Sequence, residues 1–240
     1  MKISEDTISI LNNFSSINAA LLFNEGSDIF TISEAKNILA KASVDETFPR
    51  EFGIYQLSEF LSAVSLLDNP DFDFNAESVK VKAGNSRQTI KYSYTDPSLI
   101  TSPPNKGNID FPEPDVQFVL DKEDLKTLQK ASGVLHLPHV CVKVDDGKLS
   151  VSVMDMETPN SSNAFDLSIS DEETIVFSTE FEESDLFDDY CMTFDVMNLK
   201  LFPGKYLVEI SNKGLAHFVN QDVDVEYWIS AESQNSTISV

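Results

Sequence analysis

The middle of the chain reads Leu120-Asp121-Lys122-Glu123-Asp124-Leu125-Lys126-Thr127-Leu128-Gln129-Lys130-Ala131-Ser132. This stretch has the pattern of a short amphipathic helix. Asp121 is a good N-cap, because its carboxylate can accept hydrogen bonds from the unpaired N–H groups of the first turn. The acidic pair that follows Lys122 places negative charge at the positive end of the helix dipole. Leu125, Leu128 and Ser132 share one face, so we expect that face to pack on a sheet.

The lysines of this helix form a row. Lys122, Lys126 and Lys130 lie at positions i, i+4 and i+8, which places them on one face. They are three of only 17 basic residues in a chain with 40 acidic ones. Lysines at this spacing are common on a solvated helix face, and they also suit a row of phosphate contacts. The helix alone leaves both interpretations open.

Composition limits the classes of function. The net charge of −23 argues against general attraction to nucleic acid, so any DNA contact must use a local basic surface. A chain of 240 residues suffices for one large domain or two smaller ones, and 17 Phe supply a core. No signal-peptide pattern and no apolar run of about 18 residues is present, so we expect no membrane contact and a place in a reducing cytoplasm.

The two cysteines, Cys141 and Cys191, both lie in segments of alternating apolar residues. Such a position is typical of a buried free thiol, and a reducing cytoplasm agrees with it. We therefore expect two free thiols rather than a disulfide.

The first part of the chain contains two helical patterns. Apolar residues at helical spacing predict helices over 4–15 and 56–67. Residues 19–24 and 28–33, joined by Glu25-Gly26, have the pattern of a hairpin. Further strands are expected at 36–43, 52–55, 72–75, 78–83 and 89–94.

Residues 95–114 interrupt this order, because several prolines prevent regular structure there. The second part then starts with a strand at 116–120 and the helix quoted above. A hairpin is expected around Asp145-Asp146-Gly147, pairing 140–144 with 149–154, and a short helix at 195–201. Other strands are expected at 164–169, 174–179, 191–194, 205–211, 216–219 and 223–230.

The two parts share an order of elements: helix, strands, second helix, strands. We therefore expect an α+β fold with two similar domains, each with two helices covering one face of a sheet. The expected boundaries are 1–95, a connector at 96–115, and 116–240.

Few residues suggest catalysis. His136 and His139 lie near Cys141, but a second cluster at metal-ligand spacing is missing, so we expect neither a metal nor a cofactor. Dense acidic runs at 171–173 and 180–189 suit a solvated outer surface. They leave open a metal-dependent enzyme that uses these loops, or a structural or adaptor protein with a duplicated fold.

A set of different short motifs lies in order along nearly the whole chain. They are Met1-Lys2-Ile3-Ser4-Glu5-Asp6-Thr7, Asn13-Phe14-Ser15-Ser16-Ile17-Asn18, Asp96-Pro97-Ser98, Pro104-Asn105-Lys106, Phe111-Pro112, Glu123-Asp124-Leu125 and Met197-Asn198-Leu199-Lys200-Leu201-Phe202-Pro203-Gly204-Lys205-Tyr206. This collinear set resembles the sliding clamp of T-even-type bacteriophages, within the superfamily of ring-shaped DNA clamps. Residues 24–50 and 155–190 carry no part of the resemblance.

The resemblance implies a non-enzymatic processivity factor. Three subunits would close into a homotrimeric ring of six domains, with sheets outside and helices around a hole that holds double-stranded DNA. The ring would tether the phage DNA polymerase and be opened by an ATP-dependent clamp loader. It would also activate late transcription together with a sigma-type factor and a co-activator.

The resemblance also suggests roles for single residues. Lys122, Lys126, Lys130, Lys200 and Lys2 are the expected DNA-facing residues, whereas the first two helices offer little positive charge. Partner peptides of clamps dock an apolar anchor near the connector. The expected pocket residues are Val116, Phe118, Leu135, Phe202, Pro203 and Tyr206, for which ordinary core packing is the alternative.

Overall fold

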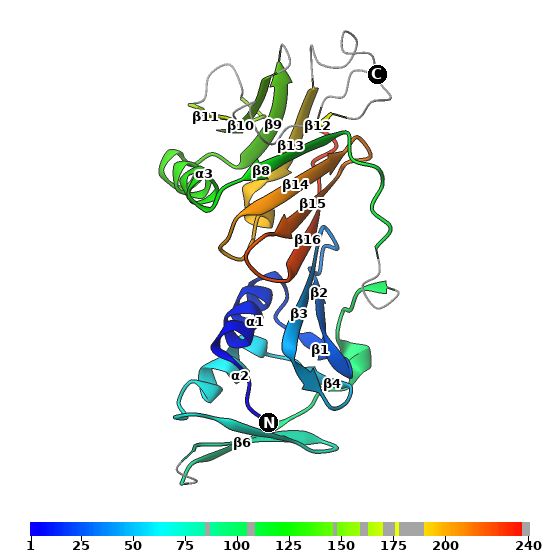
Figure 1. The fold of residues 1–240 in the computed structure, drawn as a ribbon, viewed down its shortest axis with the longest axis vertical. Coiled ribbons are helices and arrows are strands. Elements are labelled where there is room, and N and C mark those ends of the chain that lie inside the picture. Colours follow the sequence, from blue (N-terminus) through cyan, green and yellow to red (C-terminus); the bar gives the residue numbers. More distant parts are fainter. Residues whose placement is uncertain are drawn as a thin grey trace. The chain divides into compact units, whose positions relative to one another are not determined.

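The computed structural model describes residues 1–84, 87–104, 109–145, 148–158, 163–169, 176–177 and 190–236. The chain divides into two units, Met1–Ile109 and Asp110–Val240, and the division falls within the connector stretch. Each unit combines helix with antiparallel sheet, so the fold is α+β with two similar domains (Figure 1).

Unit 1 carries two α-helices. Helix α1 (Glu5–Ile17) begins at Ser4, whose side chain accepts a hydrogen bond from the Thr7 N–H. Helix α2 (Leu57–Val64) turns Phe60 and its other apolar residues inward and packs beside α1. Both helices are where apolar periodicity predicts them, although α2 ends before residue 67.

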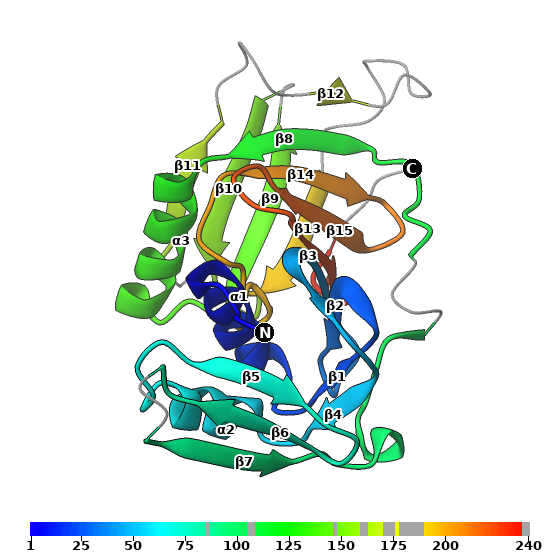
Figure 2. The ribbon, with the colours of Figure 1, turned by 60° about the horizontal axis from the view of Figure 1, so that its bottom comes forward.

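The strands of unit 1 form small antiparallel sheets. Strand β1 (Leu21–Phe23) pairs with β4 (Phe52–Ile54), and β2 (Gly26–Ile32) pairs with β3 (Ile38–Phe48). Strands β5 (Asp71–Phe74), β6 (Ser78–Lys82) and β7 (Thr89–Ser93) form a third sheet in that order, drawn in front of α2 in Figure 2. A 3₁₀ turn, η1 (Pro97–Leu99), follows.

The predicted hairpin over 19–33 is wrong, because β1 and β2 do not pair with each other. Gly26 has a φ of +118°, and the β2–β3 register shifts between Gly26 and Asp28. The chain therefore enters β2 through a bulge, and β1 takes β4 as its partner instead.

An aromatic cluster fills unit 1. Phe23 stacks on Phe52 with ring centroids 4.5 Å apart, and Phe48 lies 4.8 Å from Phe23. Tyr94 packs on Phe52 at 4.9 Å, and burial raises its pKa to about 12. These contacts join β1, β3 and β4 to the chain that follows β7.

Unit 2 contains two sheets. One has the order β12 (Val176–Phe177), β8 (Val116–Leu120), β14 (Tyr206–Ser211), β15 (Leu215–Asn220) and β16 (Val225–Ser230). The other has the order β11 (Phe165–Ser168), β10 (Lys148–Met154), β9 (His139–Asp145) and β13 (Tyr190–Asp195). The hairpin predicted around residues 145–147 is confirmed as the β9–β10 pair. Helix α3 (Lys122–Leu135) packs on β10 and β11.

The helix predicted over 195–201 is wrong. Only a 3₁₀ turn, η3 (Val196–Asn198), forms there, with the Asp195 carboxylate accepting from the Met197 N–H. Within the described ranges, unit 2 thus has one α-helix where unit 1 has two.

The prediction of free thiols is also wrong. Cys141 on β9 and Cys191 on β13 form a disulfide, with Cα atoms 6.1 Å apart. Strand pairing aligns Thr193 with Cys141 and Cys191 with Lys143, so the two cysteines are diagonal neighbours on one sheet face. Fifty residues separate them in sequence, and a local reading of each strand cannot reveal this pairing.

Two sheet edges are covered by the ends of the chain. The Phe72 N–H of β5 donates to the Met1 carbonyl at 2.8 Å, and the Met1 ammonium donates back to the Phe72 carbonyl. On β13, the Thr193 carbonyl accepts from the Glu232 N–H. The outermost strands on the opposite sides of these sheets, as formed by the described residues, are β7 and β11.

Candidate nucleic-acid interface

Helix α3 follows the predicted pattern and extends further, to Leu135. Asp121 occupies the N-cap position with extended backbone, although its side chain makes no capping bond. Leu125, Leu128 and Ser132 are buried, and the Ser132 hydroxyl donates to the Leu137 carbonyl at 2.7 Å. His136 ends the helix in the left-handed conformation with a φ of +57°.

The lysine row lies on the exposed side of this helix. Lys122, Lys126 and Lys130 are all exposed. Lys126 has a weak surface contact with Glu123 at 3.7 Å, a pair that contributes little binding energy in water. Lys122 and Lys130 make no ion pair within the described part of the chain. The row is therefore available to an anion.

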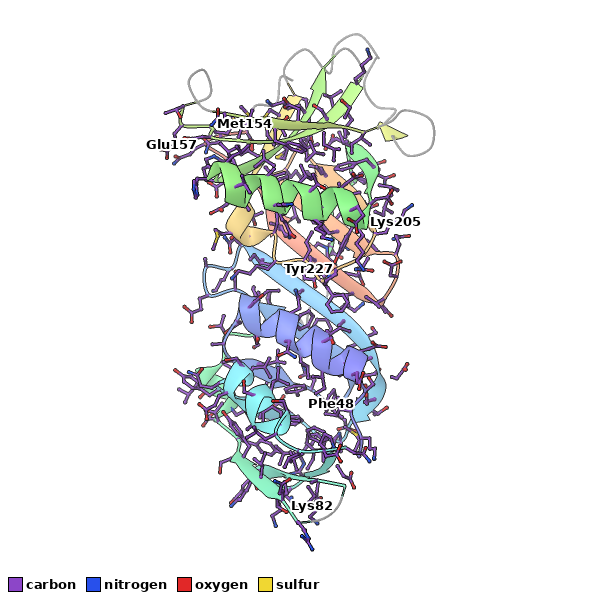
Figure 3. All side chains as sticks on the ribbon, turned by 90° about the vertical axis from the view of Figure 1, so that its left-hand side faces the viewer. Phe48, Lys82, Met154, Glu157, Lys205 and Tyr227 are labelled. Atoms are coloured by element: carbon purple, nitrogen blue, oxygen red, sulfur yellow. A yellow bond between two sulfur atoms is a disulfide. The ribbon has the colours of Figure 1, made fainter. Side chains whose placement is uncertain are left out.

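Acidic groups bound the row at its N-terminal end. Lys205 Nζ lies 3.3 Å from Asp121, and Figure 3 shows Lys205 at one end of α3. Burial, with a smaller effect from the Asp121 charge, raises the pKa of Asp124 above its ordinary value. No acidic residue follows Asp124 in α3, so positive charge dominates from Lys126 towards the C-terminal half of the helix.

A hydrogen bond brings the Lys200 segment against α3. Gln129 Nε2 donates to the Leu199 carbonyl at 3.3 Å, and Lys200 follows directly as a half-buried residue. Gln129 and Leu199 also line an apolar cavity between α3 and the sheets, which Phe118 and Val196 border too. Lys200 stays a prediction as a DNA-facing residue. The sequence analysis gave Gln129 no role, because helical position does not reveal a distant carbonyl partner.

The two helices described in unit 1 offer no comparable row. Helices α1 and α2 contain no basic residue. Several of their polar side chains instead donate to carbonyls of their own helix, as Ser9 does to Glu5 and Ser62 to Ser58. Lys2 lies just before α1 and donates to the Asn69 side chain. It is in a different unit from the α3 lysines, so the proposed DNA-facing residues form one group in unit 2 and one separate position.

The expected partner pocket divides into buried and accessible residues. Val116, Phe118 and Tyr206 are at most 1% exposed and belong to the core of unit 2. Leu135 and Phe202 are half-buried, and Pro203 is exposed. The Tyr206 hydroxyl donates to the Phe202 carbonyl, which fixes the turn before β14. Only Leu135, Phe202 and Pro203 are therefore open to a partner in this conformation.

The remaining sites considered from sequence are occupied by other interactions or fall outside the described ranges. Cys141 is in the disulfide, and His139 Nδ1 accepts from the Met156 N–H at 3.1 Å. No group of three His, Cys, Asp or Glu side chains suited to a metal occurs among the described residues. The acidic runs 171–173 and 180–189 lie outside those residues. None of the helices described is long and apolar enough to cross a membrane.

Solved structures with the same architecture define the class of fold. The proliferating cellular nuclear antigen of Entamoeba histolytica is 12% identical with a TM-score of 0.65, covering 94% of each chain. The antigen of A. fulgidus, solved with the C-terminal region of FEN-1 bound, is 14% identical with a TM-score of 0.66, again covering 94% of each chain. The fold is therefore that of the DNA clamps.

Sequence comparison then gives the family. Residues 4–102 match the family described as DNA polymerase processivity factor, and residues 117–233 match gp45 sliding clamp, C terminal. The sliding clamp of Vibrio phage KVP40 is 30% identical over 97% of this chain and 100% of its own length. That of Escherichia phage RB69 is 27% identical over 97% of this chain and 98% of its own. The chain belongs to this phage sliding clamp family, whose members are DNA polymerase processivity factors.

Proposed function

We propose that the protein closes as a homotrimeric ring around double-stranded DNA and tethers the phage replicative DNA polymerase. The observation that carries this proposal is the exposed row Lys122, Lys126 and Lys130 on the single α-helix described in unit 2. In a chain of net charge −23, such a row concentrates positive charge where DNA contact requires it. Lys200 and Lys2 are proposed as further DNA-facing residues.

The open strand edges support a ring. Among the described strands, β7 in unit 1 and β11 in unit 2 each end a sheet, and such edges are templates for pairing with another chain. Pairing β7 of one subunit with β11 of the next is a head-to-tail contact. Contacts of that kind generate closed rings when the rotation between subunits completes a circle.

The contacts with DNA are proposed to be weak and independent of sequence. Lysine ammonium groups on an exposed helix contact phosphates, which carry no base information. Topological closure would retain the ring, and a few screened contacts would still let it slide. The acidic remainder of the chain would repel DNA from other surfaces.

The other proposed partners follow from the family. An ATP-dependent clamp loader opens the ring. The clamp itself catalyses no reaction. It acts in the host cell cytoplasm. A late-transcription sigma-type factor and a co-activator use the clamp as a mobile activator. We propose that partner peptides dock near Leu135, Phe202 and Pro203, the accessible members of the apolar set, with Val116, Phe118 and Tyr206 forming its buried floor.

The lysine row can be tested by changing Lys122, Lys126 and Lys130 together to Gln. The trimer, with a light-scattering mass near three times 26.7 kDa, should remain intact. The amount of clamp retained on circular DNA in the presence of loader and ATP should fall. The slope of the logarithm of DNA affinity against the logarithm of salt concentration should become less steep by up to about three. Polymerase product length should shorten accordingly.

A matched control changes Lys36, Lys148 and Lys213 to Gln, because these lysines are exposed and lie off α3. The control removes the same total charge, so it distinguishes the effect of where the lysines lie from the effect of the net charge of the protein. If both triple variants lost DNA equally, the α3 row would be an ordinary solvated face. A monomeric wild-type protein without effect on product length would contradict the ring itself.

A further inference from the structure

A histidine lies between two carboxylates on the outer face of unit 2. His217 Nδ1 is 2.9 Å from Glu209 Oε2, and His217 Nε2 is 2.9 Å from Glu226 Oε2. Strand pairing fixes this arrangement, because His217 on β15 is directly opposite Glu209 on β14 and Trp228 on β16. The side chain of His217 is only 12% exposed, so little water competes for these bonds.

With both carboxylates ionised, only imidazolium can donate a hydrogen bond in each of the two contacts. A neutral imidazole carries one N–H, so it can donate to only one of the two carboxylates. The other nitrogen would then present a lone pair to a carboxylate oxygen. Imidazolium donates from both nitrogens and adds opposite charge to each contact. The second oxygen of Glu209 accepts from Gln117 Nε2 at 2.7 Å, so that carboxylate is held as an acceptor.

Aromatic rings enclose the imidazole. The Trp228 ring is stacked on it, with centroids 4.7 Å apart and an angle of 8° between planes. The Phe111 ring, from the connector, lies 5.3 Å away at 44°. An imidazolium stacked on the Trp228 face gains a cation–π attraction that a neutral ring lacks.

The connector is thereby attached to unit 2 at two points. At its end, the Asp115 N–H donates to the Ile210 carbonyl at 2.8 Å, and the Asp115 carboxylate accepts from the Asn212 N–H. These bonds do not depend on a histidine. Four residues earlier, Phe111 is held by its contact with His217. The first attachment is made by the backbone and carboxylate of Asp115, whereas the second is a ring contact with the imidazole.

We propose that His217 is a protonation-dependent clasp that holds Phe111 of the connector on the sheet formed by β14, β15 and β16. The groups facing the imidazole in the described structure are Glu209, Glu226, Trp228 and Phe111, with Gln117 behind Glu209. Deprotonation leaves one carboxylate contact without a donor and weakens the ring contacts. The connector segment before Asp115 then loosens. This clasp does not depend on the assembly state of the protein.

Trp228 makes the clasp measurable, because it is the only tryptophan in the chain. A stacked imidazolium quenches indole emission more than a neutral imidazole does. In the full-length protein, Trp228 emission should therefore rise in one step as pH increases from 5 to 9. His217→Gln should remove that step. Glu209→Gln should reduce that step, because one of the two carboxylates that accept from imidazolium is lost.

A control and a second readout complete the test. His136→Asn changes an exposed histidine whose left-handed backbone suits Asn, and it should leave the step unchanged. Hydrogen exchange in segment 109–113, corrected for its intrinsic pH dependence, should quicken at high pH and in His217→Gln. Exchange at the Asp115 amide should stay slow. An identical emission step in His217→Gln would overturn the clasp, as would wild-type emission that does not change with pH. If His217→Gln does not fold, the emission step of Glu209→Gln serves as the test instead.

Discussion

At the scale of single residues, Glu46 joins the first helix to the sheet of unit 1. One carboxylate oxygen accepts from the Ser4 N–H, and the other accepts from the Thr7 hydroxyl at 2.6 Å. Partial burial alone raises the pKa of Glu46, but the hydrogen bonds from Thr7 and Ser4 outweigh it. The pKa therefore lies below the ordinary value. The ionised carboxylate is the form that stabilises the fold.

This lowered pKa sets the pH dependence. A depressed folded-state pKa contributes stability above the unfolded value, near 4.3, and loses it as pH falls through the folded value. Glu46→Gln should lower the free energy of unfolding by about 1 kcal/mol at neutral pH, an estimate reduced for solvent screening. The difference from wild type should shrink below about pH 4. Urea denaturation at several pH values measures it.

Asp45→Asn is the matched control, because Asp45 is exposed and adjacent on the same strand. It removes one carboxylate charge without removing the bonds to Ser4 and Thr7. An equal loss of stability in both variants, at every pH, would assign the effect to net charge instead of to the helix start.

The position of a single residue could be predicted from the sequence where it follows from local spacing. The exposed lysines of α3 were identified because helical periodicity alone decides which face they occupy. Gln129 and His217 were not, because their partners Leu199, Glu209 and Glu226 come from other segments. Strand register creates the environment of His217, and register cannot be read from β15 by itself.

At the scale of elements, α3 contains a glycine that the fold does not require. Gly133 lies inside the helix, and a Cβ built there would meet no atom within 4 Å. Gly133→Ala should therefore raise the free energy of unfolding by about 0.5–1 kcal/mol, because the unfolded chain loses conformational freedom. Chemical denaturation gives the measurement, and DNA retention should not change.

Gly53 on β4 is the contrasting position. A Cβ there would lie 2.6 Å from Ile100 Cδ1 and 3.0 Å from the Thr95 carbonyl oxygen. Gly53→Ala should lower stability by about 1–3 kcal/mol through overpacking. If both substitutions had the same sign, local space at the glycine would not control the outcome.

Elements with strong local signals were predicted well. Capping residues and apolar periodicity located α1 and α3, and the turn residues located the β9–β10 hairpin. The predicted β1–β2 hairpin failed because Gly26 starts a bulge, not a tight turn. The predicted helix after Asp195 failed because its two inward apolar positions, Val196 and Leu199, pack one turn against the core and do not support a longer helix.

At the scale of the whole molecule, the two strands proposed to pair between subunits, β7 and β11, carry opposite charge. Lys91 is exposed on β7, and Lys80 and Lys82 are exposed on the neighbouring strand β6. Asp166 is exposed on β11, where it also accepts from the Ser152 hydroxyl at 2.6 Å. In the proposed head-to-tail ring, these basic and acidic edges meet, which favours the correct pairing of subunits.

Charge reversal at these edges tests the assembly. Lys91→Glu should weaken the trimer by on the order of 1–3 kcal/mol over three interfaces, seen as a lower light-scattering mass on dilution. Adding Asp166→Lys to the same chain should restore part of the mass. Lys213→Glu, on an exposed turn, supplies the same charge change away from both edges. If the light-scattering mass of Lys91→Glu on dilution equalled that of wild type, the charge on β7 would not contribute to the subunit interface.

The overall α+β class and the doubled arrangement could be predicted because the order of elements repeats along the sequence. The unequal helix count could not, since it depends on whether residues 195–201 find enough apolar surface to pack against. The pairing of β7 and β11 with other chains also stays a prediction, because strand alternation is the same at an open edge and at a paired one.

The bond between Cys141 and Cys191 has a consequence for the connectivity of the chain. It makes residues 141–191 a closed covalent circuit that includes β9, β10, β11 and the acidic runs. Breaking one peptide bond inside this circuit opens the backbone without separating the polypeptide into two molecules. The two pieces stay tied at neighbouring strands, so the second sheet of unit 2 can keep its strand order after a cut. Only a cut combined with reduction of the sulfur link releases them from each other.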